Sequence, residues 1–114
     1  MIEELIDKTF KLRDATHIAH WKTKSYSEHK ALGKYYEGVV GGLDKLVEAY
    51  QGVFGIVEEV ENEAEDIVAQ IKDQILWLNE NRDKIAGNIP ALENIVDELT
   101  ALHMTTLYKL ENLR

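Results

Sequence analysis

The chain has 114 residues, with 13 Lys and Arg against 21 Asp and Glu, a net charge of −8 and no cysteine. This length suits a single domain, the lack of cysteine excludes disulfides and thiolate chemistry, and the acidic balance disfavours nucleic acid and anionic membranes as partners. No apolar run has the roughly 18 residues of a membrane span, and the first residues lack the basic start of a secretion signal, so we expect a cytoplasmic protein.

Apolar residues recur at steps of three and four along most of the chain, a spacing that predicts amphipathic helices. The predicted helices span residues of about 2–24, 29–54, 58–86 and 90–113, with Ser27 as N-cap of the second and Pro90 in the first turn of the fourth. The acidic stretch 58–66 is interpreted as the solvated start of the third helix. Because short links place consecutive helices antiparallel, we expect one all-α domain over residues 1–114, an antiparallel four-helix bundle.

Adjacent glycines, Gly41 and Gly42, lie in the middle of the second predicted helix. Each costs roughly 1 kcal/mol relative to alanine in a helix interior, so something should offset the cost. Close approach of another helix at Gly38, Gly41 and Gly42 is the simplest explanation. The alternative is a kink or a break, and a break would leave helical hairpins or a three-helix domain.

Several polar residues interrupt the apolar pattern and are candidates for chemistry. His17 and His20 lie one turn apart on the first helix, His29 is at the start of the second, and Asp44 and Glu48 project from one face of the second. Imidazoles and carboxylates without thiolates suit first-row ions such as iron, manganese or zinc. The alternative is that the histidines are hydrogen-bonded core residues and the carboxylates are surface charges.

Helix geometry limits which of these residues could share an ion. A di-iron centre inside one bundle uses Glu-x-x-His motifs, and the sequence contains none. His29 and Asp44 are fifteen residues apart on one helix, which is about 22 Å at 1.5 Å per residue. They could bind one ion only if Asp44 and Glu48 came from a second, antiparallel copy of the helix. Such a two-fold arrangement creates two identical sites.

The same residues carry a resemblance to a known family. Residues 17–25 (HIAHWKTKS), residues 29–36 (HKALGKYY) and the pair Asp44-x-x-x-Glu48 resemble the Dps branch of the ferritin-like superfamily. With Tyr50, Gln51 and Gly52 included, the chain is most similar to small phage-type ferritin-like proteins. The resemblance implies a ferritin-like bundle that binds iron through His20 and His29 of one subunit and Asp44 and Glu48 of its two-fold mate. His17 is a further candidate ligand.

The activity implied by the resemblance is that of a ferroxidase, the oxidation of Fe(II), often by peroxide. Iron is the expected metal, with zinc or manganese as alternatives, and the expected assembly is at least a two-fold dimer through the second helix. A twelve-subunit shell and DNA binding are not expected, because the chain is short and has no Lys-rich tail. The alternative function is a non-catalytic helical-bundle protein, phage-encoded in type, that serves interaction or assembly and keeps only the fold.

Overall fold

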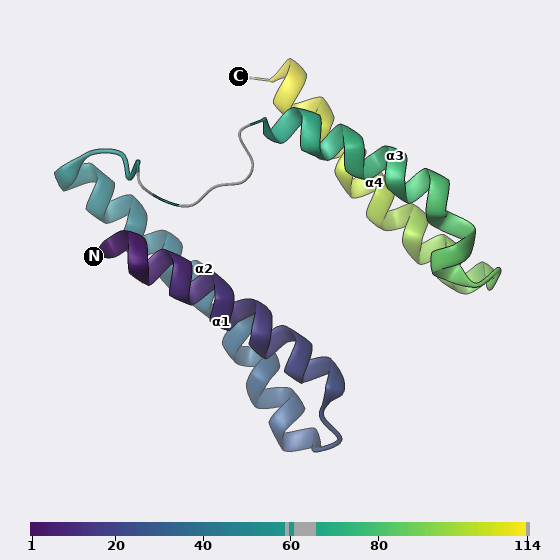
Figure 1. The fold of residues 1–114 in the computed structure, drawn as a ribbon, viewed down its shortest axis with the longest axis horizontal. Coiled ribbons are helices and arrows are strands. Elements are labelled where there is room, and N and C mark those ends of the chain that lie inside the picture. Colours follow the sequence, from purple (N-terminus) through teal and green to yellow (C-terminus); the bar gives the residue numbers. More distant parts are fainter. Residues whose placement is uncertain (59, 61–65, 114) are drawn as a thin grey trace. The chain divides into compact units, whose positions relative to one another are not determined.

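The computed structural model describes residues 1–58, 60 and 66–113. These residues form four helices, α1 (Ile2–Lys22), α2 (Tyr26–Phe54), α3 (Ile67–Ala86) and α4 (Pro90–Asn112) (Figure 1). No strand occurs in the described ranges, so the predicted all-α class with four helices is confirmed. The chain divides into two units, Met1–Glu61 and Asn62–Arg114, and each contains one antiparallel helical hairpin. The packing of all four helices into a single domain stays a prediction.

The first hairpin turns through three residues between α1 and α2. The α2 N-cap is Ser25, whose hydroxyl accepts a hydrogen bond from the Glu28 N–H at 3.3 Å. The prediction that Ser27 caps this helix is therefore wrong, because Ser25 already satisfies a free N–H at the helix start. The early cap adds Tyr26 to Glu28 to the helix and leaves His29 in its second turn, facing α1.

The second helix continues without interruption past its paired glycines. Its 29 residues run from Tyr26 to Phe54, which rules out the break at Gly41 and Gly42 and the three-helix alternative (Figure 1). A Cβ added at Gly38, Gly41 or Gly42 would meet nothing within 4 Å among the described residues. No helix of the described chain makes the close approach expected there, so the role of these glycines toward a second copy stays a prediction.

The third helix starts later than predicted. It begins at Ile67 rather than at residue 58, and Glu58 and Val60 are not helical. Asp66 is its N-cap and accepts a hydrogen bond from the Ala69 N–H at 3.0 Å. The interpretation of residues 58–66 as helix is thus wrong at its described positions, while residues 59 and 61–65 lie outside the described ranges. A carboxylate at the cap binds a free N–H and stabilises the positive end of the helix dipole.

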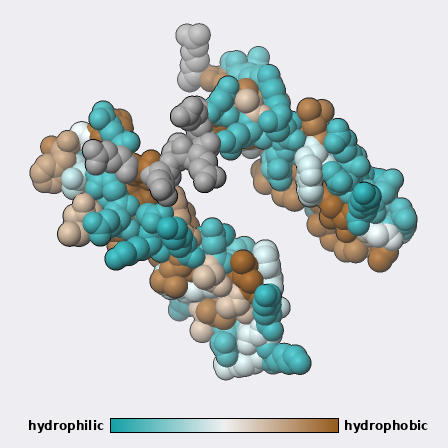
Figure 2. Space-filling model, in the orientation of Figure 1, coloured by the Kyte–Doolittle hydropathy of each residue, from teal (hydrophilic) through white to brown (hydrophobic). Residues whose placement is uncertain are grey.

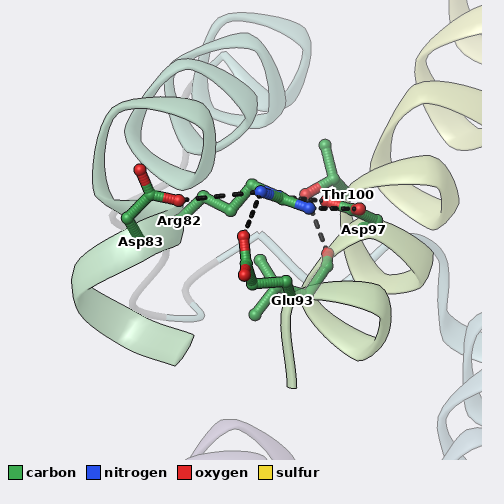
Figure 3. A network of polar contacts seen from close by, with 6 residues as sticks. Arg82, Asp83, Glu93, Asp97 and Thr100 are labelled. Atoms are coloured by element: carbon green, nitrogen blue, oxygen red, sulfur yellow. Dashed lines mark hydrogen bonds and ion pairs between the residues drawn. The ribbon is translucent and has the colours of Figure 1, made fainter. Parts of the chain in front are cut away.

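An arginine on α3 joins the two helices of the second hairpin (Figure 3). Arg82 Nε and Nη2 donate to the two carboxylate oxygens of Asp97 on α4, at 2.6 and 2.8 Å, and its Nη1 donates to Glu93. The hydrogen bond from Arg82 lowers the pKa of the Asp97 carboxyl. The geometry is the bidentate fork that gives arginine–carboxylate pairs their directional specificity, and it fixes how α4 lies along α3.

Each hairpin has a thin core. The buried apolar side chains are Ile6 and Leu43 in the first unit and Leu78 and Ala86 in the second. Large apolar side chains remain exposed on every helix, and Figure 2 shows apolar residues at the surface of both hairpins. Two helices cannot cover both flanks of their apolar stripes, so each hairpin keeps apolar surface that is not buried within it. None of the described helices is long and apolar enough to cross a membrane.

Candidate metal site

Two predicted ligands, His20 and His29, lie together at the turn of the first hairpin. Their rings are stacked, with centroids 3.6 Å apart and planes inclined by 19°. The Nδ1–H of His20 donates to the backbone carbonyl of His29 at 2.6 Å, and the Nδ1–H of His29 donates to the carbonyl of His20 at 2.9 Å. Each ring therefore ties its own helix to the opposite helix.

These reciprocal bonds fix the chemical form of both rings. A carbonyl oxygen only accepts hydrogen bonds, so the proton must reside on Nδ1 of each imidazole. In the neutral ring the lone pair is then on Nε2, which is the atom free to bind a metal ion. Metal-binding histidines commonly donate their other N–H to a backbone carbonyl, which orients the ring and raises its basicity. The pair thus has the outer hydrogen bonds of two metal ligands.

A glycine on α2 makes room for the His20 ring. Gly33 is buried and lies one turn after His29. A Cβ at this position would lie 3.1 Å from His20 Cε1 and 3.3 Å from His20 Nδ1, closer than ordinary van der Waals contact. The absence of a side chain at Gly33 therefore allows the His20 ring to lie flat between α1 and α2.

The third candidate ligand, His17, lies in a different environment. Its ring stacks on Tyr36 of α2 at a centroid distance of 3.8 Å, and Trp21 lies 4.3 Å from it. The His20 and Tyr36 rings are nearly perpendicular, with centroids 5.2 Å apart, and the Arg13 guanidinium lies over the Tyr36 ring at 5.4 Å. His17 is 6.3 Å from His20 between ring centroids and belongs to an aromatic stack rather than to the histidine pair.

A shallow depression runs from the histidine pair along α2. Its lining includes His20, His29, Lys30, Lys34, Glu37 and Gly38. The lysines are exposed and lie on the rim, and the Lys30 ammonium is 5.4 Å from the centre of the Tyr26 ring. Two lysines against the single carboxylate of Glu37 leave a net positive charge beside the two potential ligands, so a bound cation would require additional negative charge.

The predicted carboxylate ligands lie elsewhere on the same helix. Asp44 and Glu48 are both exposed and one turn apart on the uninterrupted α2. Fifteen residues of continuous helix put His29 and Asp44 about 22 Å apart. Within the described ranges, no three His, Asp or Glu side chains are close enough to hold a metal ion together. Within one chain, the imidazole pair and the carboxylate pair are therefore separate.

A protein-family model matches residues 20–110, which is most of the chain. The chain belongs to this family, DUF5856, a family of unknown function. The part that matches DUF5856 begins at His20 and contains His29, Asp44 and Glu48, whereas His17 precedes it. No curated protein and no solved structure matches the chain.

Sequence reasoning missed two residues of this site in the DUF5856 chain, Gly33 and Tyr36. The role of Gly33 was overlooked because the sequence analysis considered the glycines farther along α2, although the spacing of one turn between His29 and Gly33 is visible in the sequence. Tyr36 was assigned to the apolar stripe of α2, and nothing in its spacing indicates which α1 ring it stacks on. Both roles depend on the rotation of α1 against α2, which helical periodicity leaves open.

Proposed function

We propose that the chain is a Dps-like, ferritin-like protein of the cytoplasm that binds iron at a site shared by two copies. His20 and His29 of one copy and Asp44 and Glu48 of the partner subunit are the ligands, and α2 is the dimer interface. His17 has the aromatic role described above and is the reserve ligand. The observation that carries the proposal is the reciprocal hydrogen bonding of His20 and His29, which leaves both Nε2 lone pairs free.

The imidazole pair alone makes an incomplete site. Two nitrogen ligands leave most of the coordination positions of a first-row ion open, and the neighbouring lysines repel a cation. A carboxylate pair adds two negative charges and hard oxygen ligands, which correct both deficiencies. Because Asp44 and Glu48 are about 22 and 28 Å from His29 along one helix, they reach it from a second, antiparallel copy of α2.

The donor set also fits the proposed reaction. Carboxylate oxygens are hard, anionic ligands that favour Fe(III) over Fe(II), and so the site would lower the free energy of the oxidised ion. With peroxide as the oxidant, two Fe(II) each lose one electron, the O–O bond breaks, and two protons are taken up to form two waters. The role of the protein is to bind and position the substrate ions.

Metal titration of the native protein and of Asp44→Ala/Glu48→Ala tests the proposal. We expect Co(II) or Fe(II) to bind at one site per chain of the dimer. The double variant should bind more than about 100-fold more weakly, since even outer-shell groups contribute 10–100-fold. Circular dichroism should show unchanged helix content. Asp73→Ala/Glu80→Ala is a matched control, because both residues are exposed on α3 and the charge change is the same. A monomeric native protein, or unchanged affinity in the α2 variant, would contradict the shared site.

The apolar surface of each hairpin, which either the other hairpin or another chain could cover, is compatible with a second candidate function, that of a helical interaction or assembly protein without chemistry. Exposed apolar side chains such as Phe10, Leu46, Ile95 and Leu102 offer surface for packing against other chains. Metal analysis of protein purified without chelator separates the candidates. A metal-free protein that forms stable oligomers would favour assembly, whereas iron bound in proportion to chain concentration favours the metal site.

A further inference from the structure

Two pairs of opposite charge lie symmetrically along α2. Lys30 and Lys34 are one turn apart, and Asp44 and Glu48 are also one turn apart. Lys30 and Glu48 are equally far from residue 39, and so are Lys34 and Asp44. In an antiparallel pair of identical helices, residues equally far from the centre lie opposite each other. A single register centred on residue 39 therefore places both lysines of one copy opposite both carboxylates of the other.

This register also serves the proposed metal site. His29 is ten residues before the centre and Glu48 is nine residues after it. His29 of one copy and Glu48 of the other therefore differ by only one residue in their distance from the centre. Gly41 is two residues after the centre and lies on the same helix face as these charges, because it is seven residues from both Lys34 and Glu48. It is exposed and has open space around the position of a Cβ. Two helices can approach closely at such a position. In this register the lysines of one copy lie opposite the carboxylates of the other, and His29 lies at the axial level of Glu48.

All four charged side chains are free to make such contacts. Lys30, Lys34, Asp44 and Glu48 are exposed, and none forms an ion pair with another residue in the described ranges. The two lysines line the depression that contains His20 and His29. The Tyr26 ring lies beneath the Lys30 ammonium and holds it at this rim.

We propose that Lys30 and Lys34 neutralise Glu48 and Asp44 of the partner subunit in the metal-free dimer, and that a bound metal ion displaces them. Both parts rest on the α2 dimer of the proposed function, and only the displacement also rests on its metal site. Two carboxylates one turn apart repel each other, and the ammonium groups relieve this repulsion until a cation binds. The lysines therefore stabilise the dimer without metal and compete with the metal for its ligands.

Charge-swap variants test the pairing, with dimer dissociation constants measured by sedimentation equilibrium in chelator at low salt. Lys30→Ala/Lys34→Ala should weaken the dimer about tenfold, because four exposed ion pairs each contribute about a factor of two. Lys30→Glu/Lys34→Glu and Asp44→Lys/Glu48→Lys should each fail to dimerise alone and should form a heterodimer when mixed. Lys22→Glu/Lys24→Glu changes the charge equally near the turn and should leave the dimer intact. Failure of the mixed pair to associate would overturn the register.

Metal affinity tests the competition. At concentrations where both proteins are dimeric, Lys30→Ala/Lys34→Ala should bind Co(II) at least about threefold more tightly than the native chain, because two competing cations are gone. Unchanged or weaker binding would overturn the displacement. If the charge-swapped pair associates but no chain binds Co(II), the proposed metal function fails while the charge pairing stands. If Co(II) binds and the lysine variants change neither affinity nor assembly, only this inference fails.

Discussion

Replacing Gly33 with alanine separates the stability of the first hairpin from the geometry of its histidine pair. The new Cβ would lie 3.1 Å from His20 Cε1, where carbon atoms normally approach to about 3.5 Å or more. The His20 ring must therefore move by a few tenths of an ångström. That shift strains the 2.6 Å hydrogen bond to the His29 carbonyl and turns His20 Nε2 away from its present direction.

Two opposing effects set the magnitude for Gly33→Ala. Alanine in a helix interior is about 1 kcal/mol more favourable than glycine, and the tight contact with His20 consumes most of that gain. We expect a free energy of unfolding within about 1 kcal/mol of the native value. Metal affinity should fall about tenfold, because changes in the groups that orient a ligand typically cost 10–100-fold. The combination of retained stability and weaker binding distinguishes a positioning role from misfolding.

The assay is Co(II) titration followed by its visible absorption, combined with thermal unfolding by circular dichroism. Gly52→Ala is the matched control, since it lies on the same helix and a Cβ there meets nothing within 4 Å in the described chain. The control should gain about 0.5 kcal/mol and bind metal normally. If Gly33→Ala shows the same gain in stability and unchanged Co(II) affinity, the His20 ring does not depend on the space at Gly33 and the reasoning is refuted.

Three further predictions follow from other contacts. Nitrogen NMR of the neutral rings should show the Nδ1–H tautomer at His20 and His29, and an Nε2–H signal at either would contradict the reciprocal bonds. The hydrogen bond from Arg82 lowers the pKa of the Asp97 carboxyl in the folded state. The stability that this hydrogen bond contributes is therefore complete above the ordinary carboxyl pKa and is lost as the pH falls through the lowered pKa. The melting temperature of the Asp97→Asn variant should therefore fall less with decreasing pH than that of the native chain, and an identical pH profile would contradict this. Gly41→Leu should leave the hairpin folded, because the position is open within the described chain. It should increase the dimer dissociation constant at least about tenfold, since the two copies of α2 could no longer approach closely, and an unchanged sedimentation profile would place the interface elsewhere.

Helical periodicity predicted four helices correctly, but it misplaced the starts of α2 and α3, where an N-cap residue marks the first turn. The stripe that contains Val60 and Ile67 continues at helical spacing upstream of α3, so the sequence pattern extends the helix to residue 58. The observed start is set by a single local interaction, the Asp66 carboxylate on the Ala69 N–H. Ser25 and Ser27 present the same difficulty, since both are good N-caps and only the backbone conformation of the turn selects Ser25.

The sequence named candidate residues but not their contacts. Residue type and spacing singled out the histidines and the carboxylate pair, the resemblance to Dps proteins selected His20, His29, Asp44 and Glu48, and helix rise separates the imidazoles from the carboxylates within one chain. The stacking of the two histidines and the space at Gly33 require knowledge of how α1 is rotated against α2. An amphipathic pattern defines a broad face about 100° wide and so cannot fix a rotation to the accuracy of a hydrogen bond.

The register of the first hairpin explains why its core and its histidine pair occur together. His20 and His29 are equally far from the centre of the turn at Lys24 and Ser25, and so are the buried residues Ile6 and Leu43. A slip of one residue in the packing of α1 on α2 would therefore disrupt both pairs at once. Burial of Ile6 and Leu43 near the open end thus helps to hold the imidazoles in register at the turn, because a helix transmits its axial position along its whole length. The two carboxylates on α2 need no such fixing within the hairpin, since any ligand role they have depends on a second copy of the helix.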